Sequence, residues 1–317
     1  MLLPVVWAAC VIAGFLYAHQ QNIPWRMVLA ALPAFLLEAT FYYALAADNV
    51  RARIEELGDS TVATALTLAA IAPYLAVSLA FQAFSWRSFG LLTALAFLAS
   101  FWYVFCKKTA IFDIAFLVLM ATVMLTRAFP HIYPSPHPKL PLYALGQAMW
   151  VRTGVFVMLA VRRVTGVGFG FWPDRRHWKI GVLYYFLFLA CSVEVALLIH
   201  FAKPHWPPWG WEKTSFVAIG TFFGILWVVA LGEEFFFRGL LQQWIGSWTG
   251  NGVAGLLITA ILFGAVHLWF RSFPNWRFAT MAALAGVFYG MAFRQTKSIR
   301  ASMVTHALVV TTWRIFF

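Results

Sequence analysis

The sequence predicts an all-α fold, a polytopic transmembrane helical bundle of about ten or eleven spans. Of the 317 residues, 62% are hydrophobic and only 11% are charged, whereas about a quarter of a soluble domain is charged. In a soluble fold of this length, more than half of the residues cannot be buried in the core, so this many hydrophobic residues could not be kept from water. The composition therefore excludes a soluble enzyme, a disordered chain and a nucleic-acid-binding domain.

Apolar segments of suitable length recur along the whole chain. A helix that spans a bilayer needs about 20 mostly apolar residues. The expected spans are 2–18, 27–47, 61–84, 88–105, 110–126, 143–161, 180–201, 215–246, 252–270, 278–293 and 299–317. Segment 215–246 is long for one span, and we expect its polar end at 242–249 to run along the membrane interface.

Two breaks between the spans suggest how the chain is organised. Residues 48–60 are charged and predict a loop, and residues 127–141 contain five prolines and cannot be helical throughout. The proline-rich loop is the expected boundary between an N-terminal transmembrane extension of about five spans, residues 1–130, and a core of about six spans, residues 144–317. No internal repeat is visible in the sequence.

The formal net charge of +12 is interpreted as a topology signal. Lys and Arg are enriched in cytoplasmic loops of membrane proteins, and the densest basic segment is 162–179. With eleven spans, the N-terminus is expected inside, in a multi-pass protein of the bacterial inner membrane. The three cysteines are far apart and show no disulfide or metal motif. Residues 1–18 are expected to be the first span, because the first basic residue is Arg26.

Ionisable side chains inside a span indicate function, and the densest group lies at 231–239. Glu233 and Glu234 are adjacent, and Arg238 follows Glu234 by four residues. That spacing predicts an ion pair between Glu234 and Arg238 on one helix face. Glu233 points about 100° away from this face. One carboxylate is thus expected to be neutralised while the other stays available.

Two histidines are expected at a similar depth. Glu233 lies 13 residues before the end of its helix near residue 246, and His267 lies 15 residues after the next helix begins near residue 252. At about 1.5 Å per residue, both are about 20 Å from the same membrane side. His306, about seven residues into the last span, is somewhat shallower. A carboxylate and two imidazoles are therefore expected to share a cavity.

These residue types fit hydrolysis by an activated water molecule. A Glu–His pair can hold and deprotonate water, and a second histidine can donate to a developing oxyanion. The sequence has no HExxH motif of a zinc peptidase, and no metal or other cofactor is expected. A metal bound by the glutamate and two histidines stays open as an alternative.

The three motifs together resemble a known family. Glu233-Glu234-x-x-x-Arg238, then Phe263-x-x-x-His267, then a later intramembrane His306 are similar to the CPBP family of CAAX proteases and bacteriocin-processing enzymes. The resemblance covers roughly residues 144–317. It implies a glutamate-dependent intramembrane endopeptidase whose substrate is a membrane-embedded or lipidated peptide or protein segment.

The resemblance also implies a role for each residue. Glu233 is expected to be the general base, with His267 assisting it, and His306 to help form the oxyanion hole. Glu234, Arg238 and Phe263 are expected to support the site structurally. The family usually carries an asparagine four residues after the last histidine, where this chain has Val310.

Other interpretations remain open. The chain is alternatively a non-catalytic member of the family that acts as a membrane scaffold or peptide-immunity protein, which Val310 favours. A transporter with a proton relay is a further alternative, although such a protein often has inverted repeats. Four more charges lie in or near spans: Glu38, Asp113, Arg152 and Glu194. Glu38 and Glu194 are expected to pair or to line a polar crevice. Arg152 is either an interfacial side chain whose guanidinium extends to the membrane surface or the partner of Glu194.

Overall fold

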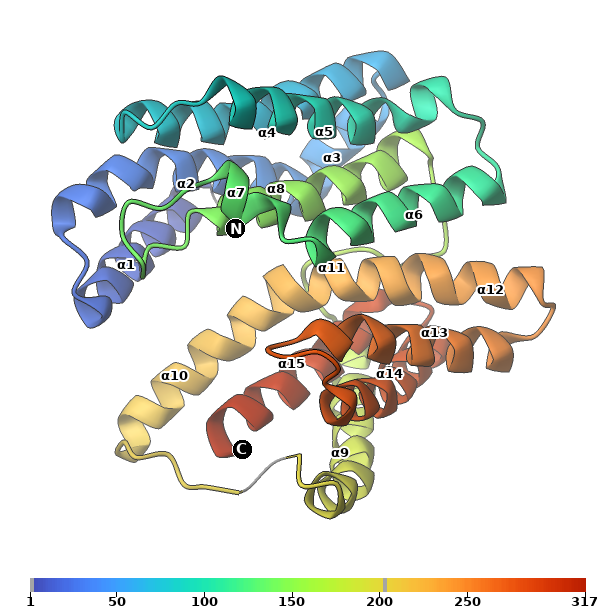
Figure 1. Ribbon diagram of the computed structural model, residues 1–317. Helices are drawn as coiled ribbons and strands as arrows, with labels where there is room; N and C mark the ends of the chain where they lie inside the picture. Colours follow the sequence, from blue (N-terminus) through green and yellow to red (C-terminus); the bar gives the residue numbers. More distant parts are fainter. Residues whose placement is uncertain (1–2, 202–203) are drawn as a thin grey trace. The chain divides into compact units, whose positions relative to one another are not determined.

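Every regular element that the computed structural model describes, in residues 3–201 and 204–317, is a helix (Figure 1). Each of the eleven expected spans contains one. Residue 2, where the first expected span begins, and Lys203 lie outside the described residues. The helices are Leu3–Gln21 (α1), Trp25–Ala46 (α2), Asp59–Ala80 (α4), Trp86–Phe105 (α5), Ala110–Leu125 (α6), Tyr143–Phe156 (α8) with Val157–Val161 (η1), Arg175–Leu198 (α9), Trp211–Trp248, Gly252–Val266 (α13), Trp276–Thr296 (α14) and Ile299–Phe316 (α15).

Eight helices in the described ranges are long and apolar enough to cross a membrane. Helix α6 is apolar but shorter, and α14 and α15 are not among the eight. All seven residues from Ala301 to Ala307 in α15 are buried, so this part of the helix is enclosed by protein and needs no apolar surface toward lipid. The polytopic helical membrane fold that the composition predicts is confirmed.

The expected charged loop at 48–60 instead begins with a short helix, Asp48–Glu55 (α3). Arg51 lies 2.8 Å from Asp48 and 3.5 Å from Glu55. Ion pairs at these helical spacings stabilise a helix that is mostly polar and has no buried residue. The interpretation as a loop was wrong for these residues because it relied on their charge, and charges at these spacings can support a helix. A second short helix, Ala128–Ile132 (α7), begins the proline-rich segment.

The chain folds as two compact units, Met1–Val164 and Thr165–Phe317, called unit 1 and unit 2. The expected boundary lies in the proline-rich loop, about 20 residues earlier. Helix α8, which we expected in the core, is therefore part of unit 1. The α8–η1 segment is enclosed by that unit, since every residue from Arg152 to Met158 is buried.

Buried polar contacts explain why α8 belongs to unit 1. Arg152 is 1% exposed and donates to Glu38 of α2 over 2.8 and 3.1 Å. The Trp150 indole donates to the carbonyl oxygen of Met120 in α6. The partner of Arg152 is thus Glu38, and the alternative pairing with Glu194 was wrong.

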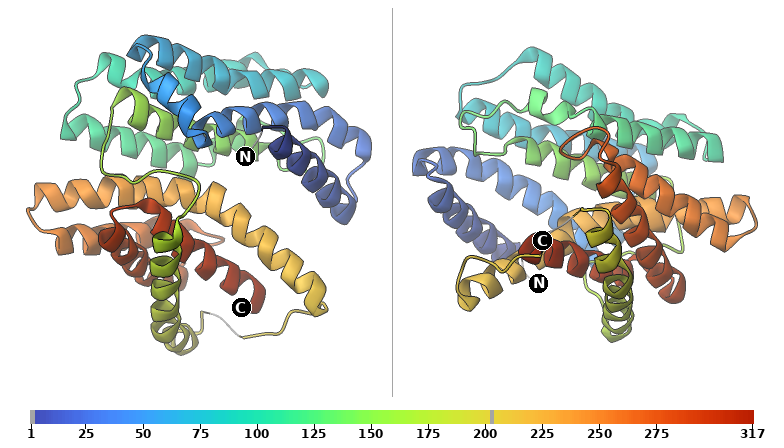
Figure 2. Two further views of the ribbon diagram at one scale, coloured as in Figure 1. Left: turned by 180° about the vertical axis from the view of Figure 1, so that it is seen from behind. Right: turned by 60° about the horizontal axis from the view of Figure 1, so that its bottom comes forward.

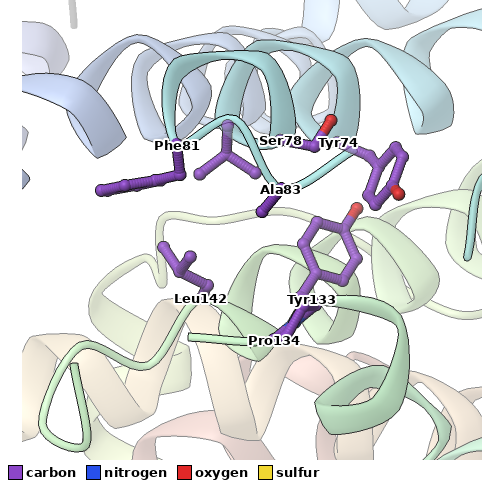
Figure 3. A pocket seen from close by; sticks show the side chains of 8 residues that line it. Tyr74, Ser78, Phe81, Ala83, Tyr133, Pro134 and Leu142 are labelled. Atoms are coloured by element: carbon purple, nitrogen blue, oxygen red, sulfur yellow. The ribbon is translucent and has the colours of Figure 1, made fainter. Parts of the chain in front are cut away.

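Unit 1 also contains a small pocket, shown in Figure 3. The rings of Tyr74 and Tyr133 lie edge to face in its wall, with centroids 5.5 Å apart. None of the candidate site residues lines this pocket, whose wall is formed by Tyr74, Val77, Ser78, Phe81, Ala83, Tyr133, Pro134 and Leu142.

Unit 2 is built around α15. This helix packs against α9, α14 and the long helix that begins at Trp211, and Figures 1 and 2 both show it between α9 and the first part of that helix. The loop that opens unit 2 fixes the start of α15. The backbone N–H of Ile299 donates to Val167, and the Ser298 hydroxyl donates to Gly168. Gly168 has φ +58°, a left-handed conformation that favours glycine.

The long helix Trp211–Trp248 changes form along its length. It consists of Trp211–Gly224 (α10), Ile225–Ala230 (η2), Leu231–Glu234 (α11), Phe235–Gln242 (η3) and Gln243–Trp248 (α12), of which η2 and η3 are π-helical. Its 38 residues exceed the roughly 20 that cross a bilayer. Figure 1 shows that α10 and α12 run in different directions. The two glutamates lie where the direction changes, in the single α-helical turn between the π-helical segments.

Candidate active site

The predicted ion pair between Glu234 and Arg238 is present. Arg238 Nη1 lies 3.1 Å from Glu234 Oε1, and both side chains are fully buried. The same carboxylate oxygen lies 2.7 Å from Nδ1 of His306, which is 4% exposed. Because an ionised carboxylate only accepts hydrogen bonds, Nδ1 of His306 carries the hydrogen. Glu234 therefore fixes the orientation of the His306 ring.

Glu233 differs from its neighbour in exposure. Its side chain is 33% exposed, whereas that of Glu234 is 0% exposed. Oε2 of Glu233 lies 3.8 Å from Nε2 of His306, which is too long for a direct hydrogen bond. The two glutamates thus face the two nitrogens of one imidazole. Glu234 is held by protein contacts, and Glu233 is the accessible carboxylate.

Aromatic rings surround the Arg238 guanidinium. It lies 4.3 Å from the centroid of Phe263, 5.2 Å from that of Tyr289 and 5.8 Å from that of Phe237. Tyr289 stacks on His306 at 4.6 Å with an interplanar angle of 13°, and Phe263 meets the same imidazole edge to face. Cation–π contacts strengthen when desolvated. These rings fix both the guanidinium and the imidazole.

Helix α14 supplies backbone oxygens to the polar stripe of the long helix. Arg238 donates to the carbonyl oxygen of Gly286, and Gln242 donates to that of Gly290. Glu234, Arg238 and Gln242 follow one another at intervals of four residues, as do the two glycines. Small residues let helix backbones approach closely in a membrane, so side chains of one helix reach the main chain of the other.

We expect Gly286→Ala to destabilise the protein by about 1–3 kcal/mol, the usual range for overpacking. An added Cβ would lie 3.1 Å from Ala260 Cα and 3.2 Å from Arg238 Nη2. Gly220→Ala in α10 is the matched control, since a Cβ there has no other atom within 4 Å. Thermal unfolding in detergent measures both, and equal melting temperatures would contradict the close packing of α14.

His267 lies where α13 ends, at the start of a short 3₁₀ turn, His267–Trp269 (η4). Its Nδ1 lies 2.6 Å from the carbonyl oxygen of Phe263. A carbonyl only accepts, so Nδ1 carries the hydrogen and Nε2 is free to accept a proton. In the described ranges, no hydrogen bond or ion pair joins His267 to Glu233. Phe263 contacts both His267 and His306, with ring centroids 4.8 and 6.0 Å apart.

Several buried polar atoms around the ion pair have no hydrogen-bond partner. Buried polar groups in native proteins are nearly always satisfied by protein or ordered water, so this cluster requires water. The described residues contain no group of three His, Cys, Asp or Glu side chains that could hold a metal ion. The unpartnered atoms are Glu233 Oε2, Glu234 Oε2, Arg238 Nε and Gln242 Oε1.

The sequence analysis missed two residues that contact this cluster, Tyr289 and Gln242. The four-residue spacing that linked Glu234 to Arg238 extends to Gln242 and would have identified it. Tyr289 had no such signal, because aromatic residues are common throughout this chain. Only the packing of α14 against α15 shows that its ring stacks on His306.

The chain was compared with known proteins. Residues 213–312 match the family described as type II CAAX prenyl endopeptidase Rce1-like. Over these residues the chain is similar to that family. The predicted resemblance to the CPBP family is thereby confirmed. The Rce1-like segment lies within unit 2 and contains all six candidate site residues as well as Val310.

A curated relative gives weaker support for the same family. The chain is 28% identical over 82 residues to the uncharacterized protein YpbD of Bacillus subtilis strain 168. The aligned region is 26% of this chain and 38% of the length of YpbD. No solved structure matches the chain.

Proposed function

We propose that this protein is an intramembrane glutamate-dependent endopeptidase that cleaves a membrane-embedded or lipidated peptide or protein segment. The observation that carries the proposal is the difference between the two adjacent glutamates. Glu234 is fully buried and bonded to Arg238 and His306, and Glu233 is partly exposed with one unpartnered buried oxygen. A supported, accessible carboxylate is what a general base requires.

In the proposed reaction, Glu233 takes a proton from water. The resulting hydroxide attacks the carbonyl carbon of the scissile peptide bond and forms a tetrahedral intermediate. The carbon–nitrogen bond then breaks, the carbonyl forms again, and the proton returns to the leaving amine. His267 assists by holding the water through its free Nε2, because its Nδ1 is occupied by Phe263.

His306 stabilises the negative oxygen of the tetrahedral intermediate. Nδ1 of His306 faces Glu234, so Nε2 is the nitrogen that donates to the oxyanion in this role. Val310 supplies no polar group, so His306 acts without the family's usual asparagine.

We expect His267→Ala and His306→Ala each to lower the cleavage rate by about 10²–10³-fold, the usual effect of losing one oriented donor or proton carrier. The purified protein is reconstituted in vesicles with two reporters, one with a lipidated C-terminal tail and one with a hydrophobic C-terminal segment. Release of the tail is followed over time, and His205→Ala, a loop histidine, is the matched control.

Three results would count against this mechanism. Full cleavage by either variant would remove that histidine from the reaction. Loss of cleavage in a strong chelator would instead indicate a metal-dependent site. If the unmodified protein cleaved neither reporter, the two histidines would have no role in the cleavage of these substrates.

The second candidate function is a non-catalytic membrane scaffold or peptide-immunity protein. Val310 favours it, since losing one oxyanion donor typically reduces turnover by about 10²–10³-fold. The two functions are distinguished in cells that lack the native gene. Under the scaffold function, Glu233→Gln restores the cellular phenotype fully while no cleavage is detected. Under the protease function, the phenotype and the cleavage are lost together.

A further inference from the structure

One end of unit 2 is covered by exposed cations. Helices α9 and α15 begin there and α14 ends there, and five basic residues of these ends are exposed. The three ends are in contact, because Arg176 of α9 donates to the carbonyl oxygen of Gln295 in α14, and Arg300 of α15 donates to that of Trp172. We call this set the cationic end; it consists of Arg175, Arg176, Lys179, Arg294 and Lys297.

We propose that the cationic end binds the headgroups of anionic phospholipids. Such headgroups attract basic segments beside the membrane surface, and the N-termini of α9 and α15 add partial positive charge. The proposal concerns a lipid surface and is independent of whether the site hydrolyses peptides.

Three cations of unit 1 provide a contrast. Arg162 makes a two-pronged pair with Asp113 at 2.8 and 2.9 Å, and Lys108 and Arg163 both pair with Asp59. These charges already have partners. In the part of the chain that the structure describes, no carboxylate lies within ion-pair distance of any residue of the cationic end.

Asp174 is the one acidic residue of the sequence between residues 165 and 193, and it is engaged as the N-cap of α9. Its side chain accepts from the backbone N–H of His177, and this hydrogen bond lowers the pKa of Asp174. Since a single capping carboxylate faces five cations, the cationic end keeps a net positive charge that an anionic ligand can balance.

The position of the cationic end fits a bilayer surface. Helix α14 has 21 residues and is thus about 31 Å long, close to the thickness of the hydrocarbon core. Lys297 follows its last residue, and Trp276 and Arg277 begin its other end. Trp172, beside Arg300, is 57% exposed, and tryptophan is typical of the membrane–water interface.

The test uses the full-length protein and a triple variant, Arg175→Gln, Lys179→Gln and Lys297→Gln. These side chains make no hydrogen bond or ion pair within the described residues, so the substitutions remove charge without breaking a contact. The control variant removes three exposed cations from the opposite end of unit 2: Lys213→Gln, Arg271→Gln and Arg277→Gln. Native mass spectrometry measures binding of phosphatidylglycerol and of phosphatidylcholine with the same acyl chains.

We expect the unmodified protein and the control variant to bind phosphatidylglycerol more tightly than phosphatidylcholine. Each charge removed should weaken the binding of phosphatidylglycerol roughly fivefold, so the triple variant should bind it about 100-fold more weakly. Equal loss in both variants would overturn the proposal, because it would show a response to total charge only. Equal affinity of the unmodified protein for the two lipids would overturn the proposal too. It would also be overturned if an acidic peptide bound more tightly than phosphatidylglycerol and were not displaced by that lipid. Unchanged thermal unfolding in phosphatidylcholine verifies that the triple variant is folded.

Discussion

Glu233→Gln is expected to lower the cleavage rate by about 10²–10⁴-fold while the protein stays folded. The amide has nearly the same shape as the carboxylate but cannot take a proton from water, so the variant loses the general base alone. Folding should be little affected, because the Glu233 side chain is partly exposed and makes no hydrogen bond within the described residues, with His306 3.8 Å away. The measurement is release of the C-terminal tail from vesicles, beside thermal unfolding of the same preparation.

Glu194→Gln is the matched control for this variant. Glu194 is an exposed glutamate of α9, in the same unit, and its substitution removes the same charge outside the cluster. We expect its cleavage rate to stay within about twofold of the unmodified protein, as is usual for a surface substitution. A Glu233→Gln variant as active as this control would exclude Glu233 as the base.

Arg238→Met is expected to destabilise the protein by about 3–5 kcal/mol, the usual cost of breaking a buried ion pair by removing one partner. Glu234 would remain fully buried with only His306 as a partner, and Phe263 and Tyr289 would lose the cation between them. Unfolding by denaturant in detergent micelles measures the effect. Arg314→Met, which replaces an exposed arginine of α15, should change the unfolding free energy by less than about 0.5 kcal/mol.

The double variant Glu234→Gln with Arg238→Met shows whether charge is the cause. Because it leaves no buried carboxylate without its cation, it should recover part of the lost stability. If the double variant were less stable by the sum of the two single effects, packing rather than charge would explain the loss.

Spacing along one helix was enough to predict the Glu234–Arg238 pair, because residues four apart face the same way whatever surrounds them. Contacts between segments that are far apart in the sequence were harder to predict. Glu38 and Arg152 are 114 residues apart, and from the sequence we named Glu194 as the possible partner of Arg152. For the same reason the sequence did not indicate that α8 packs within unit 1, which the contacts of Arg152 show.

Counting residues from the span ends predicted that Glu233, His267 and His306 lie at a similar depth, but it could not predict how their side chains are oriented. His306 was expected to be shallower than Glu233, yet its two nitrogens face Glu233 and Glu234. Which histidine lies beside the two glutamates depends on side-chain rotation and on the π-helical geometry, and a 3.6-residue pattern shows neither. The catalytic roles of Glu233, His267 and His306 therefore remain predictions that the variants above test.

The π-helical segments have a consequence for how this sequence can change. A π-helical turn accommodates one residue more than an α-helical turn, so a single deletion in η2 is tolerable to the backbone and converts the segment to α-helix. Because the π-helical turn has taken up the extra residue, the part of the helix that follows would keep its orientation about the axis. A deletion in α10 would instead turn everything that follows by about 100°, the angle between adjacent residues, and would move Glu233 and Glu234 out of their present places. Ile225–Ala230 is thus a segment in which this helix can lose a residue while the two carboxylates keep their orientation.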